Sequence, residues 1–213
     1  MKNEEFATAV GVKMKYLTKN VWMLLCAASL ILSACSKETV EEGEYDNWQT
    51  RNVAMTDQWA ANSSYRKIKT FTKDPLKTTA NSDYIYVEVL EEGTGTASPL
   101  YTDTCRLAYR GRLIPSKSYA EGYVFDQSYL GDFSWATAGT SDFLASAVVN
   151  GFCTALMNMH IGDHWRVHIP YQLGYGETAK SPIPAYSDLT FDIALFDFWH
   201  PGETRPDFKA RKR

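Results

Sequence analysis

Beyond residue 83 the chain alternates apolar and polar residues with a period of two, the period of a β-strand with one buried face. The segment 103–113 shows it most clearly, because Cys105, Leu107 and Tyr109 fall on one face, which we expect to pack inward. Further strands are expected at stretches rich in β-branched and aromatic residues, namely 84–90, 123–127, 165–169 and 189–195. The glycine- and aromatic-rich segment 129–140 is expected to be an irregular connection.

Nearer the N-terminus the spacing is helical. Between residues 45 and 62, Trp48, Met55 and Trp59 recur at helical intervals, with Asn52 on the same stripe. Such a stripe usually belongs to a helix that packs on its own domain, and the alternative is a helix that docks on another subunit. The polar segment 63–82 is expected to continue this helix or to act as a linker.

A shorter helix is expected at 152–159, ending before Gly162, a common C-terminal signal. Strands dominate and this helix lies between them in the chain. We therefore predict an α+β fold, with an antiparallel β-sheet half-wrapped around a short central helix and an N-terminal helical extension. The hydrophobic content of 45% is sufficient for a packed core. The domain is predicted to span 83–200, followed by a C-terminal tail, 201–213.

The first 35 residues have the pattern of a targeting segment. Two lysines, Lys15 and Lys19, precede a twelve-residue apolar run, shorter than the roughly 20 residues that cross a bilayer. The run ends in Leu32-Ser33-Ala34-Cys35, which resembles a bacterial lipobox. We therefore predict a signal peptide at 1–35, with an alternative start at Met14, and lipidation of Cys35. A plain secretory signal is the alternative.

A lipidated Cys35 implies a protein held on a membrane of the cell envelope by its lipid. Residues 36–44 are polar and acidic and are interpreted as a flexible tether. Position 36 is Ser rather than the Asp that often retains lipoproteins in the inner membrane, so we expect the outer membrane, on its periplasmic or surface face. Of the remaining cysteines, Cys105 and Cys153 are expected to be separate thiols.

Neither charge nor metal-binding residue types indicate a nucleic-acid or metal partner. The net charge is −3 without a concentrated basic surface, and the basic tail 209–213 is interpreted as a solvated terminus. Three histidines recur every four residues, His160, His164 and His168. However, Gly162 interrupts any helix between the first two, and the last two would lie about 13 Å apart on a strand. No metal site and no cofactor is expected.

Seven short motifs follow one another through the predicted domain. In order they are Tyr109-x-Gly111-x-Leu113, Phe125-Asp126-x-Ser128, Val148-Val149-x-Gly151-Phe152, Met159-x-x-Gly162-Asp163, Ile169-Pro170-x-x-Leu173-x-Tyr175-Gly176, Ile183-Pro184 and Leu189-x-Phe191-Asp192-Ile193. In this order and spacing they resemble the FKBP-type peptidyl-prolyl cis-trans isomerases. The resemblance covers roughly residues 83–199.

The resemblance implies an enzyme that isomerises X-Pro bonds in exported or envelope polypeptides. The catalytic residues it implies are Tyr109, Phe125, Asp126, Tyr175 and Phe191. The substrate-binding residues it implies are Phe143, Val148, Val149, Phe152 and Ile183. By the same resemblance, the Val149 N–H and the Tyr175 hydroxyl hold carbonyls of the bound peptide, and Asp126 is placed to orient the Tyr109 hydroxyl.

Rotation about an X-Pro bond breaks no bond, so the reaction needs no nucleophile or general base. Its barrier is about 20 kcal/mol, and a dry aromatic cavity disfavours the charge-separated planar amide more than the twisted transition state. The family commonly has Trp at the pocket floor, where this chain has Phe152. Two alternatives therefore stay open: an FKBP-like module that binds peptides as a chaperone without catalysis, and a structural envelope lipoprotein that pairs through its N-terminal helix.

Overall fold

The computed structural model describes residues 43–74, 76–77, 80–204 and 207. The predicted signal peptide, Cys35 and most of the predicted tether lie outside these residues. No helix among the described residues is long and apolar enough to cross a membrane.

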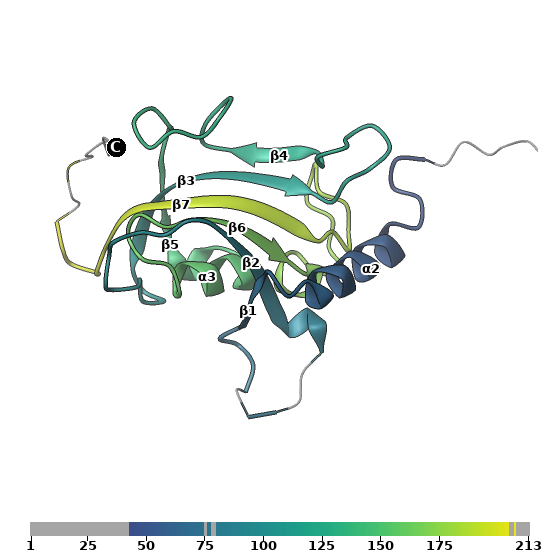
Figure 1. Cartoon of the computed structure of the whole chain (residues 1–213), viewed down its shortest axis with the longest axis horizontal. Helices are drawn as coiled ribbons and strands as arrows, with labels where there is room; N and C mark the ends of the chain where they lie inside the picture. Colours follow the sequence, from purple (N-terminus) through teal and green to yellow (C-terminus); the bar gives the residue numbers. More distant parts are fainter. Residues whose placement is uncertain (1–42, 75, 78–79, 205–206, 208–213) are drawn as a thin grey trace, which may run out of the picture. The chain divides into compact units, whose positions relative to one another are not determined.

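A seven-stranded antiparallel sheet dominates the fold (Figure 1). Its strands are β1 (Arg66–Lys69), β2 (Tyr84–Glu91), β3 (Thr104–Leu113), β4 (Val124–Gln127), β5 (Ser141–Leu144), β6 (His164–Ile169) and β7 (Leu189–Trp199). Their order is β1-β2-β6-β7-β3-β4, with β5 paired to β3. The helices are α2 (Trp48–Ala61) and α3 (Asn150–Leu156), and short 3-10 turns are η1 (Asn81–Asp83), η2 (Ala145–Ala147) and η3 (Tyr171–Leu173). The sheet curves around α3, so the predicted α+β architecture is confirmed.

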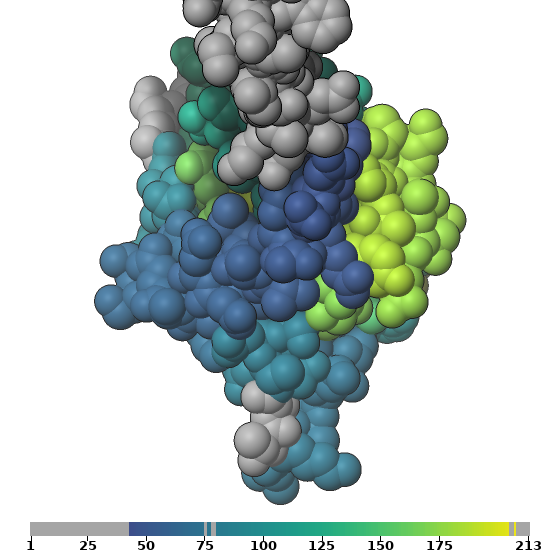
Figure 2. Space-filling view, turned by 90° about the vertical axis from the view of Figure 1, so that its right-hand side faces the viewer, coloured from purple at the N-terminus to yellow at the C-terminus, as the bar shows by residue number. Residues whose placement is uncertain are grey.

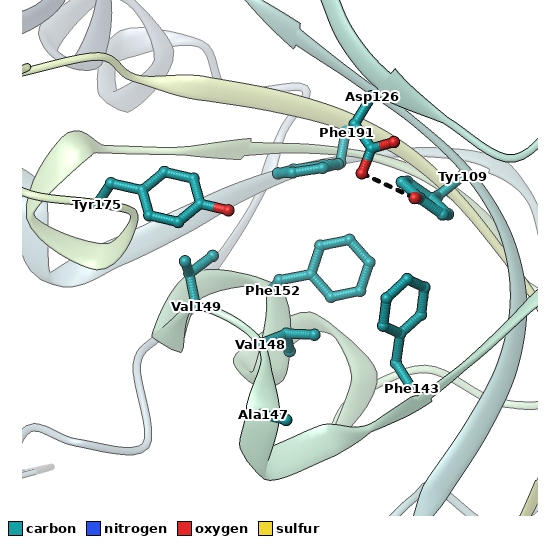
Figure 3. Close-up of a pocket in the computed structure, with 9 residues that line it drawn as sticks. All are labelled: Tyr109, Asp126, Phe143, Ala147, Val148, Val149, Phe152, Tyr175 and Phe191. Atoms are coloured by element: carbon teal, nitrogen blue, oxygen red, sulfur yellow. Dashed lines mark hydrogen bonds between the residues drawn. The ribbon is translucent and has the colours of Figure 1, made fainter. Parts of the chain in front are cut away.

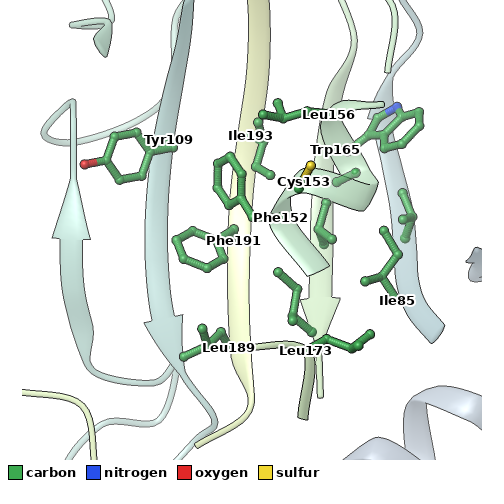
Figure 4. Close-up of a cluster of buried hydrophobic side chains, with 14 of the residues drawn as sticks. Ile85, Tyr109, Phe152, Cys153, Leu156, Trp165, Leu173, Leu189, Phe191 and Ile193 are labelled. Atoms are coloured by element: carbon green, nitrogen blue, oxygen red, sulfur yellow. The ribbon is translucent and has the colours of Figure 1, made fainter. Parts of the chain in front are cut away.

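The main core lies between α3 and the concave face of the sheet (Figure 4). Leu156 of α3 and Trp165 and Ile193 of the sheet are almost fully buried in it. Gly151 permits this close packing, because a Cβ atom there would lie 2.3 Å from Cγ2 of Ile169 on β6. Any larger residue at 151 would push α3 off the sheet.

The two cysteines of the described chain are both free and both buried in this core, which confirms the prediction of separate thiols. Burial raises the pKa of the Cys105 thiol to about 12 and that of the Cys153 thiol to about 11. Both are therefore neutral thiols at physiological pH, and neither has the lowered pKa of a reactive cysteine.

The opposite face of the sheet is also covered, which the period-two pattern did not indicate. The segment 129–140 is irregular, as expected, but it packs a second hydrophobic cluster onto β3 and β7. That cluster comprises Ala108, Tyr129, Trp135, Ala138, Ala194 and Phe196, with Phe133 packed against it. Ala108, on the face of β3 opposite Cys105, is consequently buried as well.

Helix α2 packs on its own domain, which decides between the two alternatives for the N-terminal stripe. Trp48 and Trp59 are buried and belong to the main core cluster. The Trp59 ring stacks on the His168 ring with centroids 4.7 Å apart. Val53, by contrast, is on the exposed side of the helix.

Two strands were not predicted from the sequence. The segment 63–82, expected as a helical continuation or linker, contains β1, which pairs with β2 from Arg66 opposite Val87. The prediction for this segment was wrong, and the sheet begins before residue 83. Strand β5 pairs with β3, with Cys105 opposite Phe143.

Candidate functional site

The structure contains a cavity of about 220 Å³ between the start of α3 and the concave face of the sheet (Figure 3). Its lining residues are Tyr109, Asp126, Phe143, Ala147, Val148, Val149, Phe152, Tyr175 and Phe191. They come from six separate parts of the fold: β3, β4, β5, β7, the connection from η2 into α3, and the turn after η3. Eight of the ten catalytic and substrate-binding residues that the family resemblance implied are therefore brought together around one cavity.

The walls are aromatic rings that meet edge to face. Phe152 and Phe191 are perpendicular, with centroids 4.9 Å apart, and Tyr109 and Phe143 meet at 79° and 5.4 Å. Such edge-to-face pairs are a favourable arrangement of aromatic rings. Phe152 and Phe191 are both buried, so one side of the cavity is a dry hydrocarbon surface.

Phe125 differs from its predicted place, because it is not among the residues that line the cavity. Its ring packs on the edge of Phe191, at 5.5 Å and 87°. Gly111 makes room for this pair, since a Cβ atom there would lie 2.6 Å from both rings. Phe125 therefore supports the aromatic wall. Gly111 is the residue that permits the packing, and its signal in the sequence is its place in the Tyr-x-Gly-x-Leu motif.

Ile183 is the second predicted residue that does not line the cavity. It is buried in the main core, in a small hairpin where its carbonyl accepts a hydrogen bond from the Lys180 amide. Ala147 lines the cavity although it belongs to none of the motifs. A small side chain in a turn carries no chemical signal, and only its position next to Val148 relates it to the motifs.

A hydrogen bond joins two polar groups of the lining. The Tyr109 hydroxyl donates to Oδ2 of Asp126 over 2.8 Å (Figure 3), as the sequence suggested. Burial, and then this hydrogen bond, raise the pKa of Tyr109. Burial and the charge of Asp126 also raise the pKa of Tyr175. Both phenols are therefore protonated donors throughout the physiological pH range.

Two hydrogen-bond donors of the lining residues have no partner among the described residues. The Tyr175 side chain is 37% exposed at the rim, and Figure 3 shows its hydroxyl directed over the cavity opening. The backbone N–H of Val149, at the N-cap of α3, likewise has no acceptor among the described residues. Donors at such positions are available to carbonyl groups of a bound molecule.

The lining contains one carboxyl group and two phenols but no thiol, imidazole or aliphatic hydroxyl. It therefore lacks the nucleophile-and-base pair needed for covalent catalysis. The histidines considered above lie elsewhere. His168 is enclosed by Trp59 and Tyr65, and burial lowers its pKa to about 4. Among the described residues, no group of three or more His, Cys, Asp or Glu side chains is placed to hold a metal ion.

Comparisons with known proteins agree with this geometry. Residues 95–196 match the model of the FKBP-type peptidyl-prolyl cis-trans isomerase family. The chain is 35% identical over 117 residues to the macrophage infectivity potentiator of Trypanosoma cruzi. It is 36% identical over 110 residues to the FKBP-type 22 kDa peptidyl-prolyl cis-trans isomerase of Escherichia coli strain K12. These alignments cover 54% and 51% of this chain and 54% and 47% of the relatives, so the chain spans about half the length of each.

Solved structures give the same fold. A peptidyl-prolyl cis-trans isomerase from Pseudomonas syringae pv. tomato superposes with a TM-score of 0.54 at 23% identity, covering 74% of this chain and 97% of that one. FkpA from Escherichia coli superposes with a TM-score of 0.53 at 22% identity, covering 93% and 83%. At these identities the likeness establishes an FKBP-like fold.

Proposed function

We propose that this protein catalyses rotation about X-Pro bonds of polypeptides. The chain has an FKBP-like fold, and its residues 95–196 match the model of the FKBP-type peptidyl-prolyl cis-trans isomerase family. The observation that carries this proposal is the convergence, on one aromatic cavity, of eight of the ten residues that the family resemblance implied. The cavity is smaller than the 300 Å³ or more of typical small-molecule sites. It is suited to one proline side chain, with the rest of the peptide on the surface.

The proposed mechanism is differential stabilisation of a twisted amide. The planar X-Pro amide is charge-separated by resonance, whereas the twisted transition state has lost that resonance. A dry wall made by Phe152 and Phe191 stabilises the less polar, twisted form relative to the planar ground state. No proton is transferred, which agrees with a lining that holds no nucleophile or base pair.

The polar groups of the cavity orient the peptide. We assign the Tyr175 hydroxyl and the Val149 N–H, which have no acceptor among the described residues, as donors to peptide carbonyls on either side of the proline. The Tyr109–Asp126 hydrogen bond holds two side chains of the lining in place.

The peptide-binding alternative shares the same cavity, so activity must decide between them. The experiment is a protease-coupled assay of an X-Pro peptide, and exchange NMR on the same peptide, with the full chain in detergent. We expect acceleration above the uncatalysed rate. Binding of the peptide without acceleration would assign the chain to the non-catalytic module, and neither binding nor acceleration would refute both. The pairing alternative is disfavoured because Trp48 and Trp59 are buried within their own domain.

We further propose that the protein is anchored by a lipid on Cys35 in the cell envelope, in the outer membrane, and acts on exported proteins. The support is in the sequence: a twelve-residue apolar run leads directly into Leu-Ser-Ala-Cys. Among the described residues, no helix could provide an anchor by crossing the bilayer. The proposed partners are proline-containing polypeptides and the membrane itself.

A further inference from the structure

Three buried hydrogen bonds join α2 to two consecutive residues just ahead of β7. Trp48 Nε1 donates to the Ser187 hydroxyl over 2.8 Å. The Asp188 N–H donates to Oδ1 of Asn52 over 2.7 Å, and the Thr56 hydroxyl donates to Oδ2 of Asp188 over 2.8 Å. Asn52 and Asp188 are fully buried. The polar side chains on the buried face of α2 thus converge on Ser187 and Asp188.

Ser187 and Asp188 in turn hold both ends of the segment 171–188. Asp188 Oδ1 accepts a hydrogen bond of 2.8 Å from the Tyr171 N–H, where the segment begins. The Ser187 hydroxyl donates over 2.7 Å to the carbonyl of Pro184, next to Ile183. The carboxyl group of Asp188 therefore links Thr56 of α2 to Tyr171, the first residue of the segment.

The turn that carries Tyr175 is fixed within this segment. The Gly176 N–H donates to the Tyr171 carbonyl over 2.8 Å, and the Tyr186 N–H donates to the Gly176 carbonyl over 2.9 Å. A continuous path of hydrogen bonds thus runs from Thr56 through Asp188 and Tyr171 to the residue after Tyr175. Figure 2 looks onto α2, in dark blue, with the yellow-green surface of the later segment beside it.

The start of α2 also contacts the connection between β3 and β4. Arg51 donates to the Pro115 carbonyl over 3.0 Å, and the Glu44 carboxylate accepts hydrogen bonds from Ser116 and Ser118. That connection leads into β4, which carries Asp126. The region around α2 therefore touches the β3–β4 connection as well as the residues just ahead of β7, and the contacts to Ser187 and Asp188 are the buried ones.

We propose that α2 positions the substrate-binding segment 171–188, with Thr56 and Asn52 acting through Asp188 to set the place of the Tyr175 hydroxyl. This inference rests on the proposed function. Residues 48–61 lie outside the segment 95–196 that matches the family, so the support comes from this chain's own extension. Thr56 and Asn52 are positioning residues, since they do not line the cavity.

The decisive comparison is Thr56→Val against Thr56→Ser in the full chain. Val keeps the shape but removes the donor to Asp188, whereas Ser retains a hydroxyl. One hydrogen bond has a net value of about 0.5–1.5 kcal/mol, which corresponds to roughly two- to tenfold. We expect kcat/KM for an X-Pro peptide to fall by about that factor in Thr56→Val and to change less than twofold in Thr56→Ser. Exposed Val53→Ala is a control for unspecific change in α2.

A double-mutant cycle separates positioning from general destabilisation. If Thr56 acts through the Tyr175 hydroxyl, Thr56→Val should cause no further loss in a Tyr175→Phe background. An equal loss in both backgrounds would overturn the inference. Hydrogen exchange provides a readout independent of activity: amides of 171–188 should exchange faster in Thr56→Val, with β6 and β7 unchanged. Unchanged exchange in 171–188 would refute the positioning role even in an active enzyme. If the amides of 171–188 exchange faster in Thr56→Val but the wild type has no isomerase activity, only the proposed function is refuted.

Discussion

The Tyr109 hydroxyl lies 2.8 Å from Oδ2 of Asp126, so a side-chain hydrogen bond at the cavity adds to the pairing of β3 with β4. Replacing Asp126 with Val removes the acceptor, so the partly buried hydroxyl of Tyr109 loses its hydrogen-bond partner. A hydrogen bond to a carboxylate is worth about 1.5–3 kcal/mol, somewhat more than one between neutral groups. We expect kcat/KM to fall by about ten- to a hundredfold, measured with an X-Pro peptide.

Tyr109→Phe is the matched control for this bond, because it removes the donor and keeps the ring. If the two residues act as a pair, the double variant should lose less than the two single losses multiplied together. Multiplicative losses would show that Asp126 and Tyr109 act separately. Urea unfolding of each variant should accompany the kinetics, so that activity is compared among folded proteins.

Tyr175→Phe removes a hydroxyl at the rim while keeping the ring. The loss of one hydrogen bond to substrate is worth about 0.5–1.5 kcal/mol, so kcat/KM should fall about tenfold or less. The wild-type rate should also show no bell-shaped dependence between pH 6 and 8, because both cavity phenols are kept protonated. A loss of several decades, or a steep bell in that range, would contradict rotation by desolvation.

Gly111→Ala tests the packing of the aromatic wall. The added methyl would meet the Phe125 and Phe191 rings at 2.6 Å, so one ring must move. Overpacking of this kind costs about 1–3 kcal/mol, and we expect the free energy of unfolding in urea to fall by that amount. Activity should fall beyond what the unfolded fraction explains, because Phe191 lines the cavity. A variant with wild-type stability and activity would show that the wall accommodates the methyl group.

Cys35→Ser tests the anchor. If the thiol carries the lipid, the variant should move from the membrane fraction to the soluble fraction, as followed by fractionation and immunoblotting. The comparison variant is Cys26→Ser, which lies within the predicted signal peptide and should leave the protein on the membrane. Retention of Cys35→Ser on membranes washed with high salt and carbonate would contradict the lipid anchor.

The sequence was most informative where a local pattern coincided with burial. The alternation in β3 and β7 predicted their strands because one face of each meets the core. Strand β1 was missed because three of its four side chains are basic, and β5 because its four residues include no β-branched side chain. Their strand conformation depends on pairing with β2 and β3, which no local pattern records.

For the site, the family resemblance predicted eight lining residues. It could not predict how the rings pack around Gly111 and in the core. Phe125 and Ile183 therefore lie behind the lining, and Ala147 was missed. The role of α2 was partly visible, since its Trp stripe indicated packing on the domain. Its polar contacts were not, because Thr56 and Asp188 are 132 positions apart in the chain.

Asp188 has a consequence for stability that depends on pH. Its side chain is fully buried, and burial raises the pKa of this carboxyl group to about 7, although donors from Thr56 and Tyr171 act in the opposite direction. At pH values between the ordinary pKa of 3.8 and the raised pKa of about 7, the carboxyl group has lost its proton in the unfolded chain and keeps it in the folded chain. The unfolded state then binds fewer protons, so the free energy of unfolding contributed by Asp188 falls as the pH rises through this window.

Asp188→Asn removes this titration. We expect the difference in free energy of unfolding, wild type minus variant, to decrease from pH 4 to pH 7 by at most about 4 kcal/mol, at 1.36 kcal/mol per pKa unit. His168 acts in the other direction, because its pKa is lowered to about 4 and its contribution is lost as the pH falls below 6.5. His168 is present in both proteins and cancels in the difference. Imperfect pairing of the introduced amide adds only a constant offset, which leaves the change with pH unaffected. Urea unfolding at half-unit steps from pH 4 to pH 8 gives the comparison. A difference independent of pH would show that Asp188 is ionised in the folded protein, held by Thr56 and Tyr171 rather than neutralised by burial.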